Sequence, residues 1–243
     1  MSLDRTIAVI QARTGSSRLP GKVLLELYPG VSILEYQCRR LRQIEGVDAL
    51  VIATTDEPDD DAIQALAGRL GIACVRGSNK DVLSRFVKAA QITAATRLVR
   101  ITSDSPYRDP AVIAACVAQH KRGGFEYTRP GAQALPKGMR AEVIETRVLQ
   151  QLDQAPQTSE REREHVTIAV REHPERYRCG RADFPEAWAH PKFDLSVDTA
   201  EDLAFVRQIW RELCARGWPA DTQHICQLLC ERSQSRLAEG GAA

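Results

Sequence analysis

The chain has 243 residues and carries 33 basic side chains against 32 acidic ones, a formal net charge of +1 that gives no reason to expect a nucleic-acid partner. Hydrophobic residues make up 43% and charged residues 27%, as in ordinary globular proteins, and no apolar run approaches the roughly 20 residues of a membrane-spanning helix. We expect a cytoplasmic protein with free, buried thiols, because the N-terminus lacks the pattern of a secretory signal and the seven cysteines form no Cys-x-x-Cys motif.

Short apolar runs with strand character alternate with helical patterns in the first half of the chain. The runs are rich in β-branched residues, as strands buried on both faces are, and cover residues 7–10, 49–54, 72–75 and 97–102. The helical patterns begin with capping residues at Ser32, Asp59, Ser78 to Asp81, and Asp109-Pro110. This alternation predicts a three-layer α/β fold, in which a mostly parallel sheet lies between two layers of helices.

The pattern loosens in the second half. Glycines and prolines break it into short strands and turns, and a charged helix is expected over 158–174. The sequence FDLSVDT then predicts a strand that ends at Asp198, followed by a helix over 199–213. We interpret the chain as one domain, 1–243, with a core of 5–122 and 194–235 and an inserted α+β subdomain at about 123–193.

Parallel sheets bind ligands beyond the carboxyl ends of their strands. The first strand is followed there by QARTGSSRLPGK, Gln11 to Lys22, which combines cationic and small residues. Small residues such as Gly15 let backbone N–H groups approach an anion closely. We therefore expect Arg13, Arg18 and Lys22 to converge on a polyphosphate, although the spacing is neither that of a P-loop nor that of G-x-G-x-x-G. A solvated basic turn is the alternative interpretation.

Two aspartates at the ends of predicted strands suggest a metal site at the same rim. Asp104 follows the strand that ends in RLVRIT, and Asp198 ends LSVD. Mg²⁺ prefers one or two carboxylates together with substrate phosphates and water, so the pair indicates metal-assisted transfer on a nucleotide. For each aspartate, capping the next helix is the alternative.

Six stretches of the chain occur in the order and spacing of a known family: QARTGSSRLPGKVL, VIATTDEPDDD, RGSNKDVLSRF, RITSDSPYRDP, REREHVTIAV and SVDTAEDL. The chain resembles the spore coat polysaccharide biosynthesis protein F cytidylyltransferases, relatives of the sialic acid and 3-deoxy-manno-octulosonate enzymes. The resemblance implies a nucleotide-diphospho-sugar transferase-like fold. It also implies Mg²⁺-dependent transfer of CMP from CTP to an acidic sugar or related acceptor, release of pyrophosphate, and a homodimer.

The resemblance also implies roles for individual residues. Asp104 and Asp198 match the magnesium ligands, and Arg18 and Lys22 would stabilise the departing pyrophosphate. Catalysis is thereby assigned to Lys22, Arg18 and Asp104. The positions that match the triphosphate site are Arg13, Ser16, Arg18 and Lys22. The positions that match the base-binding wall are Ala12, Ala53, Thr54 and Thr55.

The acceptor site is where the chain departs from its relatives. Arg140, in GMRAEV with Glu142, stands where relatives usually have an aspartate, so the acceptor is expected to differ or to carry its own anion. A surface change of no consequence is the alternative. Arg163 and His165 are further candidates for the acceptor site or a dimer interface, although charges at helical spacing are also typical of a solvated face.

Two other functions fit parts of the pattern. A glycosyltransferase that uses a nucleotide sugar would also place carboxylates on this rim, but TSDSP contains a single aspartate. A non-catalytic CTP-binding homologue would keep the loop and release no pyrophosphate. Reaction products and CTP binding distinguish these alternatives.

Overall fold

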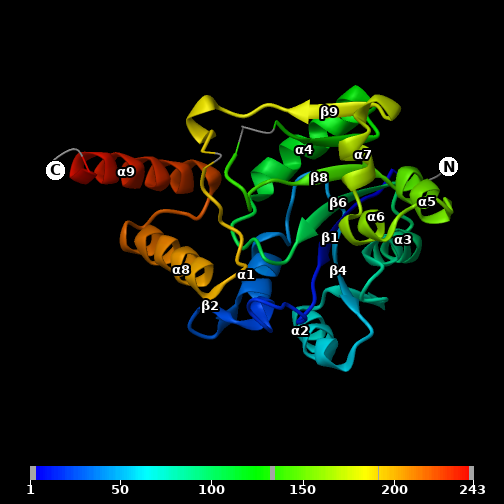
Figure 1. Cartoon of the computed structure of the whole chain (residues 1–243), viewed down its shortest axis with the longest axis horizontal. Helices are drawn as coiled ribbons and strands as arrows, with labels where there is room; N and C mark the ends of the chain where they lie inside the picture. The colour runs from blue at the N-terminus through cyan, green and yellow to red at the C-terminus, as the bar shows by residue number, and fades with distance from the viewer. Residues whose placement is uncertain (1–3, 132–134, 191, 241–243) are drawn as a thin grey trace.

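A seven-stranded sheet runs through the computed structural model, which describes residues 4–131, 135–190 and 192–240 (Figure 1). The strand order is β5-β4-β1-β6-β8-β7-β9. β8 is antiparallel to both of its neighbours and the other pairs are parallel, so the predicted mostly parallel sheet is confirmed. The strands are Thr6–Gln11 (β1), Ala49–Thr55 (β4), Ala73–Gly77 (β5), Arg97–Thr102 (β6), Tyr127–Pro130 (β7), Glu142–Glu145 (β8) and Cys179–Ala182 (β9).

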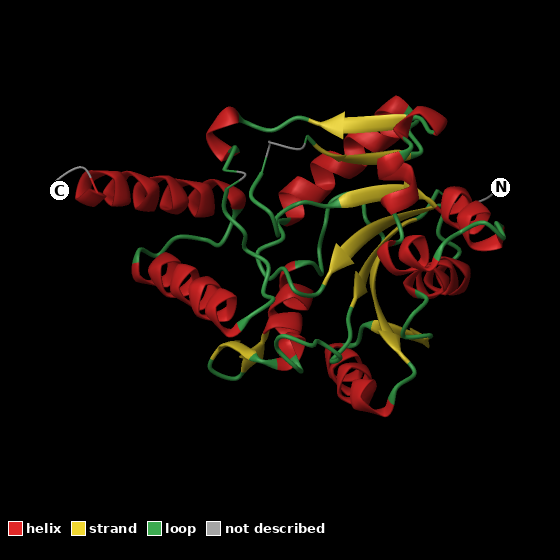
Figure 2. Cartoon of the chain, in the orientation of Figure 1, coloured by secondary structure: helices red, strands yellow, loops and turns green. Residues whose placement is uncertain are grey.

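Alternate residues of the central strands face two separate hydrophobic cores, because successive side chains of a strand point to opposite faces. In β1, Ala8 and Ile10 belong to one core, and Ile7 and Val9 belong to the other. Helices cover both faces of the sheet, as the predicted three-layer fold requires (Figure 2). The first core contains residues of α1 (Ile33–Arg40), α2 (Asp61–Leu70) and α4 (Pro110–Gly123), and the second contains residues of α3 (Val82–Thr93) and α5 (Thr146–Gln154).

Most of the predicted helix signals act as expected. Ser32 caps α1 by accepting a hydrogen bond from the Glu35 N–H, and Asp109 caps α4 in the same way from Ala111. Asp81 caps α3, with its N–H donating to the Ser78 hydroxyl. Asp59 is different, because a short 3₁₀ turn, Pro58–Asp60, precedes α2 and puts Asp60 at the cap position.

A third core lies beside the sheet and carries the C-terminal part of the chain. It joins the hairpin of β2 (Glu26–Tyr28) and β3 (Val31–Ser32) to α8 (Ala200–Ala215) and α9 (Thr222–Gly240). Tyr28 stacks on Trp210 of α8 at 4.6 Å between ring centroids. The helix predicted over 199–213 is therefore confirmed as α8.

The second half of the chain differs from its prediction in three ways. Residues 123–193 supply β7, β8 and β9 to the same sheet as β1 and β6, so this segment continues the core instead of standing beside it. The predicted strand ending at Asp198 is wrong, because this stretch is extended but makes only an isolated bridge at Asp194. The helix predicted over 158–174 is broken into α6 (Glu160–His165), α7 (Ile168–Glu172) and a 3₁₀ turn, Pro174–Arg176.

Two expectations from composition can be checked in the fold. Among the described residues, no helix is long and apolar enough to cross a membrane. All seven cysteines are free, as predicted, but Cys179 and Cys214 are exposed, so the expectation that every thiol is buried is wrong.

Candidate active site

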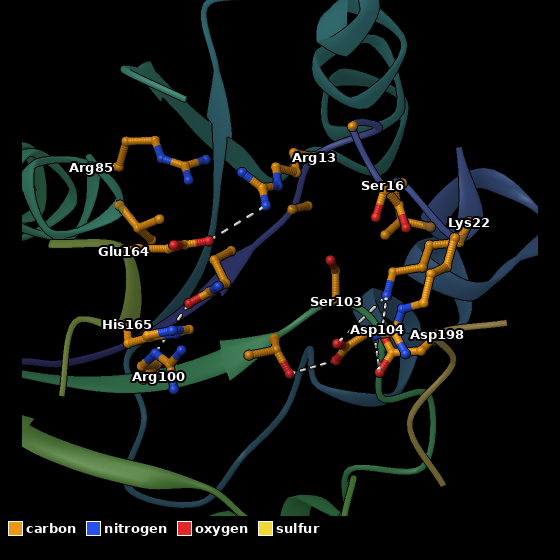
Figure 3. Close-up of a pocket in the computed structure, with 18 residues that line it drawn as sticks. Arg13, Ser16, Lys22, Arg85, Arg100, Ser103, Asp104, Glu164, His165 and Asp198 are labelled. Carbon is orange, nitrogen blue, oxygen red and sulfur yellow. Dashed lines mark hydrogen bonds and ion pairs between the residues drawn. The ribbon is translucent and has the colours of Figure 1, made fainter. Parts of the chain in front are cut away.

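Two cavities adjoin at the carboxyl ends of β1 and β6. The first has a volume of about 430 Å³ and is lined by the loop that follows β1 (Figure 3). The second, of about 550 Å³, lies on the side of β7 and β8. Five residues line both cavities, so a ligand in one would meet a ligand in the other: Arg100, Thr102, Asp104, His165 and Asp198.

The loop after β1 folds back on itself and forms one wall of the first cavity. Gly21 adopts a left-handed conformation with φ of 67°, which favours glycine, and its N–H donates to the Thr14 carbonyl at 2.9 Å. The Leu19 N–H donates to the Ser16 hydroxyl at 3.4 Å. Every loop residue predicted to bind the nucleotide lines this cavity: Ala12, Arg13, Gly15, Ser16, Arg18 and Lys22.

Asp60 anchors the loop to the end of β4. One of its carboxylate oxygens accepts hydrogen bonds from the N–H and the hydroxyl of Thr14, both at 2.7 Å, and the other accepts from Thr55. Burial would raise the pKa of Asp60, but the hydrogen bonds from Thr14 and Thr55 outweigh it and lower the pKa. The fully buried Asp60 therefore acts as a charged clamp under the loop.

The predicted base-binding wall is divided by this arrangement. Ala12 lines the first cavity, whereas Ala53, Thr54 and Thr55 are buried and lie outside its lining. The Ala53 carbonyl accepts a hydrogen bond from the Ala12 N–H at 3.0 Å, and Thr55 is bound to Asp60. Ala53 and Thr55 therefore support the loop from behind, through the Ala12 N–H and through Asp60.

The cationic loop faces both predicted metal ligands. The Lys22 ammonium lies 2.8 Å from Asp198 Oδ1, 3.9 Å from Asp104 Oδ2 and 2.7 Å from the Val197 carbonyl oxygen. Arg18 lies 3.0 Å from the other oxygen of Asp198. Burial would raise the pKa of Asp198, but Lys22 and Arg18 outweigh it and lower the pKa. Of the three loop cations predicted to converge, Lys22 and Arg18 meet the two acids in this cleft, whereas Arg13 lies 3.8 Å from Glu164.

Neither aspartate caps a helix. Thr199 caps α8 in a reciprocal capping box with Asp202, whose carboxylate also accepts from the Asp198 N–H at 3.0 Å. The Asp198 side chain is thereby left to face the cavity. In Asp104, Oδ1 accepts hydrogen bonds from the hydroxyls of Thr102 and Ser105, so that its orientation is fixed.

The donor set suits Mg²⁺. Among the described residues, no group of three or more acidic, histidine or cysteine side chains could form an all-protein metal site. Asp104 and Asp198 lie close enough together to contact one cation, as Lys22 shows. Two carboxylates are what Mg²⁺ takes from a protein when substrate phosphates and water supply the other ligands. These two residues could hold the ion.

Two arginines of the first cavity were not predicted. Arg85 of α3 is buried, donates to the Ala53 carbonyl at 3.3 Å, and has no hydrogen-bond partner for its Nε. Burial lowers its pKa to about 10, so it remains a cation at neutral pH. Arg100 of β6 pairs with Glu142 at 2.7 Å and with Gln11 at 3.1 Å. Each arginine stands among apolar residues, Arg85 in helix α3 and Arg100 in strand β6. A charged residue in such a position is the sequence signal that could have indicated a functional role.

The predicted acceptor residues are partly brought together. Arg140, Glu142 and His165 line the second cavity. Glu142 accepts from Arg100, from Thr167 at 3.0 Å and from the Tyr127 hydroxyl. Burial would raise the pKa of Glu142, but Arg100 foremost, together with the Tyr127 hydroxyl and Arg171, lowers it.

Arg163 lies elsewhere. It lines neither cavity and pairs with Asp81 at 2.7 Å and with Asp153 at 2.9 Å. Its side chain joins α6 to the start of α3 and to α5, so the structure gives it a packing role within one chain. The homodimer remains a prediction.

A strained turn sets the position of His165. Val166 has φ of 57° and ψ of −58°, and the Thr167 N–H donates to the His165 carbonyl at 2.6 Å. This is a classic γ-turn, a rare conformation that costs energy in a β-branched residue. It ends α6, buries Val166 in the core and leaves His165 between the two cavities.

Comparisons with known proteins agree with this architecture. A family model described as cytidylyltransferase matches residues 7–237. Spore coat polysaccharide biosynthesis protein SpsF of Bacillus subtilis is 34% identical over 214 residues, which span 86% of this chain and 88% of that protein. The structure of a cytidylyltransferase from Leptospira borgpetersenii has a TM-score of 0.83 at 26% identity, covering 95% of this chain and 96% of that one.

A solved structure with lower sequence identity shares the same fold. CMP:2-keto-3-deoxy-manno-octonic acid synthetase complexed with CTP has a TM-score of 0.62 at 20% identity, covering 86% of this chain and 99% of that one. The predicted nucleotide-diphospho-sugar transferase-like fold is confirmed.

Proposed function

Since the chain belongs to the cytidylyltransferase family, it is a nucleotidyltransferase, and we propose that it transfers CMP from CTP to an acidic sugar or a related acceptor with release of pyrophosphate. CTP and an acidic sugar are the ligands that the names of two similar proteins suggest. The name of the Bacillus subtilis relative suggests polysaccharide biosynthesis as the use of the product.

One observation carries the proposal: two cations of the loop and two carboxylates lie together in one cavity. The ammonium of Lys22 contacts both Asp104 and Asp198, and Arg18 contacts Asp198. A triphosphate needs cations along its length and a divalent ion between phosphate oxygens. The first cavity offers both kinds of group at the rim where parallel sheets bind ligands.

The proposed reaction is an in-line displacement at the α-phosphorus of CTP. An acceptor oxygen forms the new bond to phosphorus and gives its proton to solvent, while the bond to the bridging oxygen breaks and pyrophosphate leaves with the electron pair. Arg18 and Lys22 stabilise the charge that develops on pyrophosphate, and Arg13 and Ser16 hold the remaining phosphates in line. When bound by the two aspartates, Mg²⁺ neutralises charge on the phosphate oxygens.

The test is pyrophosphate release from CTP by the full chain with Mg²⁺ and a panel of acidic sugars that includes 3-deoxy-manno-octulosonate. We expect Asp104→Asn and Asp198→Asn to reduce the rate by about a hundredfold or more, the effect of losing several kcal/mol of transition-state stabilisation. Asp183→Asn makes the same change at an exposed position and should be as active as the wild type.

Two results would contradict the proposal. One is full activity in either variant. The other is release of a nucleoside diphosphate from a nucleotide sugar in place of pyrophosphate from CTP, since that product would indicate a glycosyltransferase.

A further inference from the structure

Three guanidinium groups in the second cavity form no ion pair with a carboxylate of the described residues. Arg129 of β7, Arg140 in the turn before β8 and Arg171 of α7 line this cavity, and we call them the arginine cluster. Glu142 attracts Arg171 and Asp194 attracts Arg140, but neither carboxylate lies within ion-pair distance of the cluster. The other cations nearby are paired, Arg100 with Glu142 and Lys137 with Asp194.

The members of the cluster repel one another. Burial lowers the pKa of Arg140, and the positive charges of Arg129 and Arg171 lower it further. Among the described residues, the Arg140 guanidinium donates only to the Leu135 carbonyl, at 3.1 and 3.3 Å, which fixes its position without neutralising its charge. Converging like charges are unfavourable unless an anion joins them.

A fourth guanidinium adds positive charge beneath the same cavity. Arg108 is buried, and its Nη2 donates to the Thr102 hydroxyl at 2.9 Å. Its Nε and Nη1 have no hydrogen-bond partner in the part of the chain that the structure describes. An unpaired buried donor costs free energy, which a bound anion and its water would recover. Burial lowers the pKa of Arg108 to about 10, so the group is still charged at neutral pH.

The charge of the whole cavity decides which anion fits. Six basic side chains line it against three acidic ones, and two of those three are the aspartates assigned to Mg²⁺. A single carboxylate would leave most of this excess uncompensated. A phosphate monoester carries about 1.5 to 2 negative charges at neutral pH, a phosphonate carries between one and two, and each offers three acceptor oxygens to the guanidiniums of the cluster.

We propose that the arginine cluster binds a phosphate or phosphonate group of the acceptor, a dianion separate from the oxygen that receives CMP. This inference rests on the proposed function. Asp104, Asp198 and His165 line both cavities, so the reacting oxygen lies at their junction and the dianion at the far end. The dianion takes no part in bond making and serves to place the acceptor.

The first test measures anion binding with the first cavity filled. Calorimetric titrations of the full chain, saturated with CTP and Mg²⁺, use methylphosphonate, inorganic phosphate or acetate at constant ionic strength. We expect the two dianions to bind at least tenfold more tightly than acetate, and Arg140→Gln and Arg171→Gln to weaken their binding by at least tenfold. Arg181→Gln, an exposed arginine of β9, is the matched control and should bind like the wild type.

The second test compares acceptors that differ in the anion alone, such as 2-hydroxyethylphosphonate and 3-hydroxypropionate. We expect at least tenfold higher kcat/KM for the phosphonate, and Arg140→Gln should raise its KM more than it lowers kcat. Melting curves of each variant establish that it is folded.

The two proposals can fail separately. If carboxylate acceptors react as well as phosphonates, or if the variants bind dianions like the wild type, the dianion proposal is wrong and the cytidylyl transfer stands. If the dianions bind to the cluster but no acceptor yields pyrophosphate from CTP, the anion site stands and the proposed function is wrong.

Discussion

Lys22 and Asp198 are 176 residues apart in the chain and form an ion pair in which the ammonium nitrogen lies 2.8 Å from Oδ1. The pair joins the loop after β1 to the segment before α8, and Asp104 lies 3.9 Å from the same ammonium. One side chain thus connects three separate parts of the chain at the point where the two cavities meet.

Lys22→Met should reduce CTP-dependent pyrophosphate release about 10²- to 10³-fold, the usual effect of removing one preorganised charge partner of a transition state. The substitution keeps the length of the side chain and removes the charge that would face the leaving group. Lys121→Met, on the exposed surface of α4, is the matched control and should be fully active. Initial rates at saturating CTP provide the measurement, and unchanged rates would remove Lys22 from the mechanism.

Asp60→Asn should destabilise the fold and loosen the loop. The buried carboxylate accepts four hydrogen bonds, two from Thr14 and two from Thr55. The amide nitrogen of asparagine is a donor, so one of these pairs of hydrogen bonds would lose its acceptor. We expect a loss of about 2 kcal/mol in the free energy of unfolding, the cost of leaving buried donors unpaired. The KM for CTP should rise as well.

Asp59→Asn, at the exposed neighbouring position, is the control and should leave both quantities unchanged. Urea denaturation and CTP saturation curves measure the two effects. A variant as stable as the wild type would show that the Asp60 clamp does not hold the loop.

Local patterns predicted much of the fold. The caps at Ser32 and Asp109 and the strands β1, β4, β5 and β6 depend on neighbours in sequence, and all were confirmed. The family was also predicted from motifs and is confirmed. The parallel alternation of the first half further predicted that the loop of Lys22 and Asp104 would share one rim, since chain order determines where strand ends lie. Asp198 reaches the same rim, although the strand predicted to end there is absent.

Other features depend on distant contacts and could not be predicted. Val197 looks like a strand residue because it is apolar, but its N–H donates to the Asp104 carbonyl and no strand pairs with it. The charged helix is interrupted at Val166, because burial of the valine side chain outweighs the strain of the turn. A β-branched residue gives no sequence signal for such a turn. Thr54 and Thr55 are the last residues of β4 and are buried, and their burial could not be read from a strand that ends in polar residues.

The stability of the protein should depend on the charge of Glu142 in acid. Because the pKa of Glu142 is lower in the folded state than its usual value, the carboxylate contributes stability above the usual carboxyl range, and this contribution is lost as the pH falls through the folded pKa. Glu142→Gln should cost about 2 kcal/mol or more near neutral pH, because Arg100 loses its partner. The difference in the free energy of unfolding between this variant and the wild type should shrink below about pH 4.

Urea midpoints across this range of pH provide the measurement. Glu172→Gln removes the exposed partner of Arg161 and should leave the midpoint unchanged at every pH. If the difference in urea midpoint between Glu142→Gln and the wild type stays constant down to pH 3, the charge of Glu142 is not what stabilises its pair with Arg100.

Thr199→Ala should affect both the fold and the site. Thr199 caps α8, and its partner Asp202 also accepts from the Asp198 N–H, so the cap fixes the backbone from which the Asp198 carboxylate extends. Loss of an N-cap hydroxyl costs about 1 kcal/mol, and we expect that loss in chemical denaturation. We also expect a weaker apparent affinity for Mg²⁺ in the pyrophosphate assay, because Asp198 is held less firmly.

Ser32→Ala removes the cap of α1 and should cost a similar stability with no change in the Mg²⁺ dependence. Equal Mg²⁺ dependence in both variants would mean that the cap stabilises α8 and does not position Asp198.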